Sequence, residues 1–295
     1  MIAAVIDLGS NTFHLLISKL EEGNPNTIYR ERVFVGLSEG GINKIKEERI
    51  AIGLNTCQRF KEIIEGYSVD QIKVVGTAVL RTAENRMDFI NPCNLIFGVP
   101  VEVINGKREA ELIYKGVQLL KIKEQPYLIM DIGGGSVEYI LVNQDKMVWL
   151  ASFQIGVGIL HALFHNTEPI NEESIGELKA FVKTKLAPLQ DAIHNYDINA
   201  IVGASGSFEV IKSINGYPDE INEFEVQDIL NLSKRLKSMN LEERLLVEGL
   251  PEKRAKLIVV AMLLIELTIE LANPNILLFS PFALKEGILN ELVNE

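Results

Sequence analysis

The sequence predicts an α/β fold in which one domain occurs twice, the two halves facing each other across a cleft. Residues 4–17 (AVIDLGSNTFHLLI) are similar to residues 128–141 (LIMDIGGGSVEYIL). Each copy reads as a strand that ends in aspartate, a turn rich in glycine and serine, and a returning strand. Strand and helix patterns alternate along the remaining chain, which is typical of an α/β fold. The length of 295 residues is about twice that of an ordinary single domain.

The first half, residues 1–120, carries the elements of one such domain. An alternating stretch after the hairpin predicts a third strand, and an amphipathic stripe then predicts a helix. Two buried apolar runs follow, each with a helical pattern behind it. In chain order we expect a strand over 27–35, a helix over 44–65, a strand over 72–75, a helix over 78–89, a strand over 101–104 and a helix over 108–120.

The second half, residues 121–295, begins with the second hairpin. Pro188 falls inside a long helical pattern and predicts a bend or break there. We expect the last helix to pack back on the first domain. The elements are strands over 127–142 and 147–153, a helix over 172–194, a strand over 200–202, amphipathic helices within 221–248, a hydrophobic helix over 253–272, a strand over 276–279 and a helix over 283–293.

The balance of acidic and basic residues limits the kinds of partner that this chain can be expected to bind. The chain has 29 basic and 40 acidic residues, a formal net charge of −11. Nucleic-acid binding needs a basic surface, so this balance argues against DNA or RNA as the partner. An anionic substrate must be captured by local chemistry, against the overall field.

The sequence also predicts a cytoplasmic protein that makes no membrane contact. Its two cysteines are too few for a disulfide framework and fit a reducing compartment. The N-terminal stretch lacks the basic region of a signal peptide. The most apolar run, residues 257–271, is shorter than a membrane span of about 20 residues and contains Glu266 and Glu270, so we expect a buried helix.

The two hairpins predict a site for phosphate and a metal ion. Glycines let backbone N–H groups approach an anion closely, and neighbouring hydroxyls add donors. Asp7 and Asp131 need a cation between themselves and a phosphate, which points to Mg²⁺ or Mn²⁺, and Glu138 on the returning strand is placed to share it. The alternative, an ordinary glycine-rich hairpin with a capping aspartate, is weakened by the matched pair. The candidate phosphate-binding residues are Ser10, Asn11, Thr12, Gly133, Gly134, Gly135 and Ser136.

Two loops that join a strand to a helix are further candidate anion sites. Free N–H groups at a helix start can face a phosphate, and an arginine there can add a bidentate contact. Serine or glycine at a helix start is, taken alone, better explained as an N-cap. The arginine is less expected, because the helix dipole disfavours it. The residues are Gly203, Ser205, Gly206 and Ser207 in one loop, and Thr77 and Arg81 in the other.

Glu109 is the candidate general base. It falls in the first turn of the helix expected over 108–120, where a carboxylate could be aimed into the cleft between the halves. The alternative is that helix electrostatics alone favour a carboxylate at this position. No Ser-His-Asp order, cysteine nucleophile or zinc motif competes with it.

Six segments carry a resemblance to a known family: DLGSNTFHLL, VVGTAVLRTAEN, EVINGKREAELIYKGV, MDIGGGSVEYI, VGASGS and ALKEGIL. In this order they resemble the exopolyphosphatase and guanosine pentaphosphate phosphatase family, part of the actin-like ATPase and sugar-kinase superfamily. The resemblance covers nearly the whole chain. It implies duplicated actin-like (ribonuclease H-like) domains whose cleft binds a phosphoanhydride chain and Mg²⁺. It also implies that Glu109 is the catalytic base, that Asp131 and Glu138 hold the metal, and that the chain forms a homodimer.

Some positions depart from the family pattern. The segment before the base is usually more acidic, whereas this chain has Lys107 and Arg108. The others are Pro281-Phe282 before ALKEG, Val137 where threonine is frequent, and His14 where arginine is also common. None removes a proposed catalytic carboxylate, so they bear on substrate preference and turnover.

We therefore expect an Mg²⁺-dependent exopolyphosphatase that releases the terminal phosphate of inorganic polyphosphate by water attack. The alternatives are a guanosine pentaphosphate 5'-phosphohydrolase and a non-catalytic sensor of polyphosphate or a guanosine alarmone. An ATP-dependent kinase on the same fold would need an adenosine pocket and an acceptor site, and the sequence identifies neither.

Overall fold

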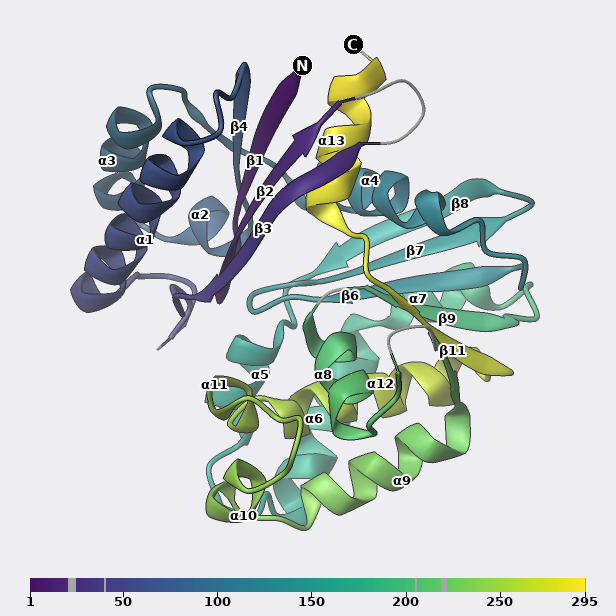
Figure 1. Cartoon of the computed structure of the whole chain (residues 1–295). Helices are drawn as coiled ribbons and strands as arrows, with labels where there is room; N and C mark the ends of the chain where they lie inside the picture. The colour runs from purple at the N-terminus through teal and green to yellow at the C-terminus, as the bar shows by residue number, and fades with distance from the viewer. Residues whose placement is uncertain (21–24, 40, 205, 219–221, 295) are drawn as a thin grey trace. The chain divides into compact units, whose positions relative to one another are not determined.

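The computed structural model describes residues 1–20, 25–39, 41–204, 206–218 and 222–294. The chain forms two compact units, each with its own β-sheet (Figure 1). The first unit comprises Met1–Leu119, Gly133–Gly135 and Phe282–Glu295. The second comprises Leu120–Ile132 and Ser136–Pro281.

The sheet of the first unit has five strands. They are β1 (Ile2–Leu8), β2 (Thr12–Lys19), β3 (Asn26–Phe34), β4 (Gln71–Gly76) and β5 (Val101–Val103). Their order across the sheet is β3-β2-β1-β4-β5. Strands β1, β2 and β3 pair antiparallel, whereas β4 and β5 run parallel to β1. The carboxyl ends of β1, β4 and β5 therefore lie along one edge.

Helices cover both faces of this sheet (Figure 1). On one face, Ile6 and Leu8 of β1 join Phe60 of α1 and Phe89 of α3 in a hydrophobic core. On the other face, α13 contacts β1 and α4. Both faces of β1 are thus buried, as its nearly unbroken apolar run requires. The helices are α1 (Glu47–Glu65), α2 (Ala78–Thr82), α3 (Met87–Phe97), α4 (Gly106–Val117) and α13 (Leu284–Asn294).

Helices α4 and α13 meet through backbone atoms. A Cβ atom added to Gly287 would lie 1.8 Å from the carbonyl oxygen of Leu112, and one added to Gly116 would lie 2.1 Å from that of Ala283. Neither distance is sterically possible, so only glycine permits this approach. Glu291 of α13 accepts hydrogen bonds from the side chains of both Arg108 and Lys115 of α4. Burial opposes ionisation of Glu291, but these two cations outweigh it and lower its pKa.

The second unit repeats the arrangement of the first. Its strands are β6 (Tyr127–Ile132), β7 (Val137–Asn143), β8 (Lys146–Phe153), β9 (Ala200–Ala204), β10 (Glu223–Glu225) and β11 (Ile276–Ser280). They lie in the order β10-β11-β9-β6-β7-β8. Three strands form an antiparallel meander and two run parallel to its first strand, with β10 added at the edge. The predicted α/β fold with a repeated strand arrangement is confirmed.

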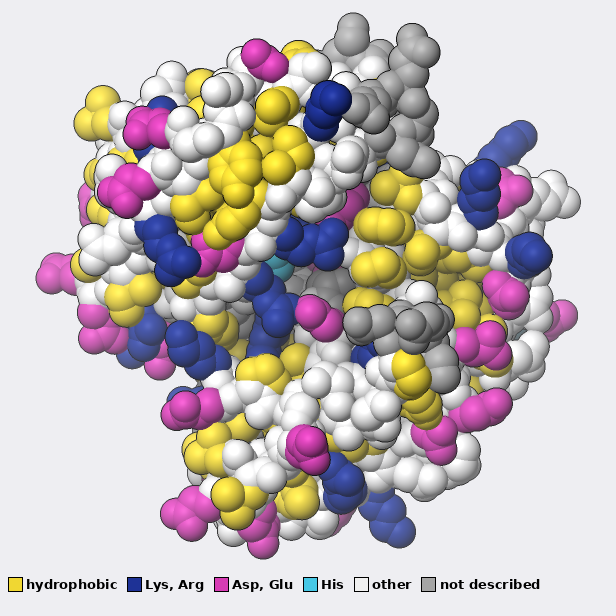
Figure 2. Space-filling model, viewed as in Figure 1, with side chains coloured by type: hydrophobic (Ala, Val, Ile, Leu, Met, Phe, Trp, Pro, Cys, Tyr) yellow, Lys and Arg dark blue, Asp and Glu magenta, His cyan; other side chains and the backbone are white. Residues whose placement is uncertain are grey.

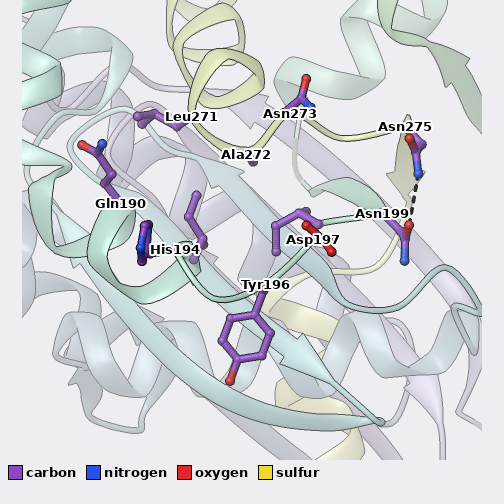
Figure 3. Close-up of a pocket in the computed structure, with 11 residues that line it drawn as sticks. Gln190, His194, Tyr196, Asp197, Asn199, Leu271, Ala272, Asn273 and Asn275 are labelled. Atoms are coloured by element: carbon purple, nitrogen blue, oxygen red, sulfur yellow. Dashed lines mark hydrogen bonds between the residues drawn. The ribbon is translucent and has the colours of Figure 1, made fainter.

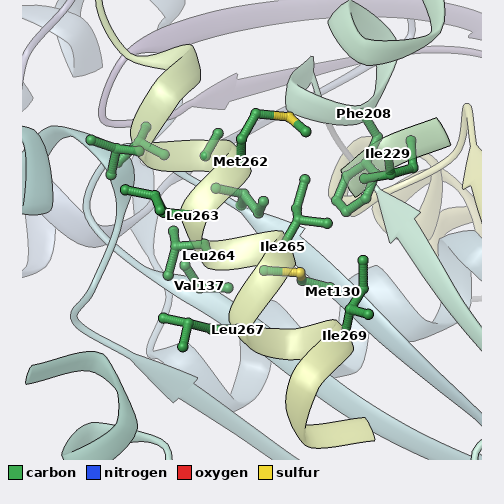
Figure 4. Packing of buried hydrophobic residues seen from close by; sticks show 14 of the residues in the cluster. Met130, Val137, Phe208, Ile229, Met262, Leu263, Leu264, Ile265, Leu267 and Ile269 are labelled. Carbon is green, nitrogen blue, oxygen red and sulfur yellow. The ribbon is translucent and has the colours of Figure 1, made fainter. Parts of the chain in front are cut away.

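The hydrophobic helix α12 forms the centre of the second unit. Its residues Leu264 and Ile265 pack beside Val137 and Met130 of the sheet (Figure 4). Within the described residues, no helix is long and apolar enough to cross a membrane. The helices of this unit are α5 (Val157–Phe164), α6 (Glu172–Lys185), α7 (Ala187–Ile193), α8 (Gly206–Ile214), α9 (Val226–Lys237), α10 (Leu241–Leu245), α11 (Glu252–Ala255) and α12 (Ile258–Ala272).

The helix expected over 78–89 is wrong as a single element. It divides into α2 and α3, because Ala83 takes an extended backbone conformation. The side chain of Asn85 exchanges two hydrogen bonds with the backbone of Ile45, and the N–H of Glu84 donates to Asn43. These tertiary hydrogen bonds replace the helical ones that the pattern favours.

Two other helix predictions need correction. Residues 223–225, expected to be helical, form β10 and pair with β11. The helix expected over 253–272 begins with the short α11 and continues as α12 after Leu257. The break expected near Pro188 occurs at Leu186, where α6 gives way to α7.

A buried polar cluster lies in the second unit. Arg244 is fully buried and donates to the carbonyl oxygens of Met239 and Ala255 and to Glu168 Oε1, the last at 2.7 Å. The rings of His161 and His165 are 4.9 Å apart between centroids. Burial lowers the pKa of His161 to about 4, helped by the charges of His165 and Lys256. Burial also lowers the pKa of His165, so both imidazoles are neutral in the folded protein at neutral pH.

On the face shown in Figure 2, acidic and basic side chains are interspersed among apolar and uncharged ones. This mixture fits a chain in which acidic residues outnumber basic ones by 40 to 29.

Gly287→Ala should destabilise the protein, since the new methyl group meets the backbone of α4 and α13 must shift. We expect a loss of roughly 1–3 kcal/mol, the usual cost of overpacking, measured by chemical denaturation. Gly176→Ala is the matched control, because Gly176 lies in α6 with open space around it and alanine is the better helix former. A Gly287→Ala variant as stable as Gly176→Ala would show that α13 docks differently.

The histidine cluster should make stability depend on pH. The unfolded chain takes up a proton on His161 near pH 6.5, but the folded chain does so only near pH 4. Stability is therefore full above about pH 6.5 and falls as the pH drops toward 4. His161→Gln should lose less melting temperature over this window than the wild type, whereas His194→Gln, at an exposed position, should follow the wild type. Equal slopes for all three proteins would remove His161 from this role.

Candidate active site

The predicted site residues of the first unit gather where its parallel strands end. Ser10 and Asn11 follow β1, Thr77 follows β4, and Glu109 lies just after β5 in the first turn of α4. The carboxyl ends of neighbouring parallel strands are the usual location of a binding site in an α/β sheet. Four segments that are distant in sequence therefore contribute to this unit near the ends of its parallel strands, counting the Gly133–Gly135 turn.

The turn of the first hairpin is tied to its surroundings. The Ser10 hydroxyl accepts a hydrogen bond from the N–H of Val79 at 3.1 Å, and so caps the start of α2. Asn11 Oδ1 accepts a hydrogen bond from Ser38 Oγ at 2.7 Å. Asn11 Nδ2 is buried and has no hydrogen-bond partner in the described part of the chain. This amide group is thus a rigidly held donor available to an anion.

The glycine turn of the second hairpin packs against the first. A Cβ atom added to Gly134 would lie 2.5 Å from Asn11 Nδ2, and one added to Gly135 would lie 2.9 Å from the Cβ of Ala78. Glycine at these positions is therefore required by packing. The turn and Asn11 lie in one compact unit, so their donor groups are neighbours.

Arg81 and Glu109 form a largely buried ion pair. Arg81 Nη1 donates to Glu109 Oε2 at 2.5 Å and to the carbonyl oxygen of Ile104 at 3.0 Å. Their side chains are 17% and 10% exposed. Asn105 caps α4 by accepting from the N–H of Arg108 at 2.8 Å, which fixes the first helical turn that carries Glu109. The sequence suggested separate roles for Arg81 and Glu109, and the fold brings them into contact.

In the second unit, two of the predicted metal-binding carboxylates lie opposite each other. Asp131 on β6 pairs directly with Glu138 on β7. Directly opposed residues of an antiparallel pair point to the same face of the sheet. Ser152 on β8 lies opposite Glu138 and donates its hydroxyl to Glu138 Oε1 at 2.7 Å. Ser152 was missed by the sequence analysis, because the strand pattern over 147–153 gave no register relative to Glu138.

The first hairpin lacks the same pair. Asp7 lies opposite His14, at the position that Glu138 takes in the second copy. The two hairpins thus share geometry but differ in charge, and the second offers the better site for a hard cation.

The donor set of the second hairpin fits Mg²⁺. Within the described residues, no three His, Cys, Asp or Glu side chains are arranged to hold a metal ion by themselves. Asp131 and Glu138 are both buried and supply carboxylate oxygens. Mg²⁺ is commonly bound by one or two carboxylates with waters and substrate phosphates completing the shell. This pair suits that mode.

Strand β9 ends beside Asp131. In the sheet register Ala204 pairs with Asp131, and Gly206 and Ser207 then open α8. A Cβ atom on Gly203 would lie 2.1 Å from the ring of Phe208, so packing accounts for this glycine. Ser205, a predicted phosphate ligand, lies outside the described residues. Among the remaining predicted residues, Thr12, Thr77 and Ser136 are buried at their turns.

Of the two basic residues before the candidate base, Lys107 and Arg108, the structure explains Arg108. Arg108 binds Glu291 through two guanidinium nitrogens. This departure from the family pattern therefore holds α13 on α4.

The chain is similar to known proteins over almost its whole length. Residues 16–295 match the Ppx/GppA phosphatase family model. An exopolyphosphatase from Cytophaga hutchinsonii has a similar structure, with a TM-score of 0.93 and 34% identity, covering 100% of this chain and 98% of that one. The Ppx/GppA family member of Aquifex aeolicus gives a TM-score of 0.82 at 25% identity, covering 100% and 98%.

A curated relative is longer. The guanosine-5'-triphosphate,3'-diphosphate pyrophosphatase of Vibrio parahaemolyticus serotype O3:K6 is 29% identical over 297 residues, which cover 99% of this chain and 59% of that protein. The chain thus spans about three fifths of the curated relatives that it matches. The family model covers far more than half of the chain, and this chain belongs to the Ppx/GppA phosphatase family.

Proposed function

We propose that the protein is an Mg²⁺-dependent exopolyphosphatase, which hydrolyses the terminal phosphoanhydride bond of inorganic polyphosphate. The observation that carries the proposal is the largely buried Arg81–Glu109 pair, at 2.5 Å, near the carboxyl ends of the parallel strands β1, β4 and β5. A carboxylate able to accept a proton and a cation able to bind phosphate are there side by side. In phosphoryl transfer, catalysis comes mainly from such positioning and charge stabilisation.

Glu109 accepts a proton from the attacking water in this proposal. Arg81 fixes the carboxylate through Nη1, and its other guanidinium donors bind the terminal phosphate. Water, base and phosphorus are then aligned by one side chain. The Asn11 amide and the N–H groups of the 133–135 turn donate to phosphate oxygens that gain charge as the bond breaks.

Asp131 and Glu138 would hold the Mg²⁺ ion, with Ser152 orienting Glu138 by its 2.7 Å hydrogen bond. The ion would supply positive charge to the phosphate oxygens. Mn²⁺ has similar preferences for oxygen ligands. The predicted metal ligand Asp7 lies opposite His14 and not opposite a second carboxylate. We therefore assign Asp7 a smaller role in metal binding than Asp131 and Glu138.

Inorganic polyphosphate is the favoured substrate for two reasons. The exopolyphosphatase from C. hutchinsonii is similar over 98% of its own length, whereas the Vibrio protein is matched over 59%. The proposed phosphate ligands also need no base or ribose. Guanosine pentaphosphate is the second candidate, because the Vibrio protein named for that class of substrate is 29% identical. A homodimer, a cytoplasmic location and a sensor role stay predictions from the sequence.

Phosphate release from polyphosphate, guanosine pentaphosphate and ATP, measured side by side, tests the proposal. We expect the highest kcat/KM on polyphosphate. Glu109→Gln keeps the size of the side chain and removes the base, so kcat should fall by roughly 10² to 10⁴ while substrate binding persists. Glu111→Gln, on the same helix, is the control and should stay near wild type. A Glu109 variant with more than about a tenth of wild-type kcat would contradict the base assignment.

The dependence of activity on Mg²⁺ should change when the neighbouring side chains Asp131 on β6, Glu138 on β7 and Ser152 on β8 are altered. Glu138→Gln removes a proposed metal ligand, whereas Ser152→Ala removes only the hydrogen bond that orients the Glu138 carboxylate. Both variants should need more Mg²⁺ for half-maximal activity, and the increase should be larger for Glu138→Gln. Ser238→Ala, on the exposed end of α9, is the control. Direct Mn²⁺ binding followed by electron paramagnetic resonance should weaken in the same order. Full activity of the wild type in excess EDTA would rule out the metal.

A further inference from the structure

A pocket in the second unit lies away from the residues of the candidate active site. It has a volume of about 410 Å³, inside the usual range for small-molecule sites of about 300–1,000 Å³. Figure 3 shows its lining: the end of α7, the loop into β9, the end of α12 and the loop into β11. The lining residues are Gln190, Ile193, His194, Tyr196, Asp197, Ile198, Asn199, Leu271, Ala272, Asn273 and Asn275.

The pocket lies at the opposite edge of the sheet from the carboxylate pair. Its loops lead into the starts of β9 and β11, whereas Asp131 lies beside Ala204 at the other end of β9. Strand β9 has five residues, which separates the two edges by roughly 15 Å. A ligand in this pocket would therefore be distinct from the substrate.

The electrostatic character of the pocket is negative. Of its described lining residues, Asp197 is the one carboxylate, and none is lysine or arginine. Two helices, α7 and α12, end at the pocket, and each helix C-terminus carries about half a negative charge. Asn273 ends α12 in a left-handed conformation, with φ of 44°, so the carbonyls of Leu271 and Ala272 lie in its final turn. The net charge of −11 adds to the attraction of a cation.

The floor of the pocket combines apolar and amide groups. Ile193, Ile198 and Leu271 supply aliphatic surface. At one end, Asn275 Nδ2 donates to Asn199 Oδ1 at 3.0 Å, and the Asn199 amide also donates to the carbonyl oxygen of Gln125. The amides are therefore fixed in place and do not collapse into the space. The site suits a molecule with a cationic end and a short hydrocarbon chain.

We propose that this pocket binds a small aliphatic amine. Its ammonium group binds the exposed Asp197 carboxylate, and the C-terminal ends of α7 and α12 at the same pocket add partial negative charge. Its methylene chain packs on Ile193, Ile198 and Leu271, as alkyl stems do along apolar surfaces. This inference does not depend on the proposed phosphatase activity.

Isothermal titration calorimetry with butane-1,4-diamine tests the proposal on the full chain. Butane-1,4-diol has the same length without charge, and succinate has the opposite charge. We expect saturable binding of the diamine at one site, no binding of the diol or succinate, and weaker affinity as salt rises. Asp197→Asn should raise the dissociation constant about two- to fivefold, the scale of an exposed ion pair. Asp191→Asn, an exposed carboxylate on α7 outside the lining, should bind like the wild type.

The outcomes separate a built site from general attraction. If the diol bound as tightly as the diamine, the positive charge of the ligand would not be needed for binding. An equal loss in Asp191→Asn would mean that the diamine responds only to the overall acidity, and unchanged binding in Asp197→Asn would exclude this pocket. Amide chemical-shift mapping of the wild type gives a second measurement that needs no variant. The largest changes should fall in residues 190–199 and 271–275, and changes elsewhere would overturn the assignment.

Discussion

The backbone contact between α4 and α13 is the constraint on which the candidate base depends. Gly116 and Gly287 let the two helices approach so closely that no side chain fits between them. Because α13 comes from the end of the chain, the first unit is complete only when residues 282–295 return to it. The ion pairs of Glu291 with Arg108 and Lys115 then fix the rotation of α4 about its axis. That rotation determines where Glu109 points.

The Arg81–Glu109 pair contributes little to the stability of the fold, but it is suited to a chemical role. Removing two charges from water costs several kcal/mol per ion, and a single salt bridge repays this only in part. Arg81 gains a second acceptor in the carbonyl of Ile104, which reduces the cost for the guanidinium. A fold that only needed stability could fill this position with apolar side chains. The pair is better explained by a function that requires a charged acceptor and a charged donor together.

Much of the fold could be predicted from the sequence, because the hairpins recur as a pattern and their strands are apolar throughout. The duplicated sheet order follows from that repeat and from the alternation of strands and helices. The division between α2 and α3 could not be predicted, since it depends on hydrogen bonds from Glu84 and Asn85 to residues some 40 positions away. In the candidate site, too, contacts between distant segments could not be predicted from local sequence patterns. Spacing in the sequence identified Arg81 and Glu109 one by one, but their contact joins two helices, and the partner of Glu138 on β8 requires the strand register.

The comparison of the two hairpins explains how a duplicated fold can divide its tasks. Both copies keep an aspartate at the end of the first strand, and the register of both hairpins is the same. The residue opposite that aspartate is His14 in one copy and Glu138 in the other. Two facing carboxylates repel each other unless a cation lies between them, whereas an aspartate facing an imidazole carries no such demand. In the proposed function the divalent cation therefore belongs to the second copy, and the first copy, beside Arg81 and Glu109, contributes phosphate donors. The two hairpins thus share one backbone register, and the residue opposite the aspartate is what distinguishes their proposed roles.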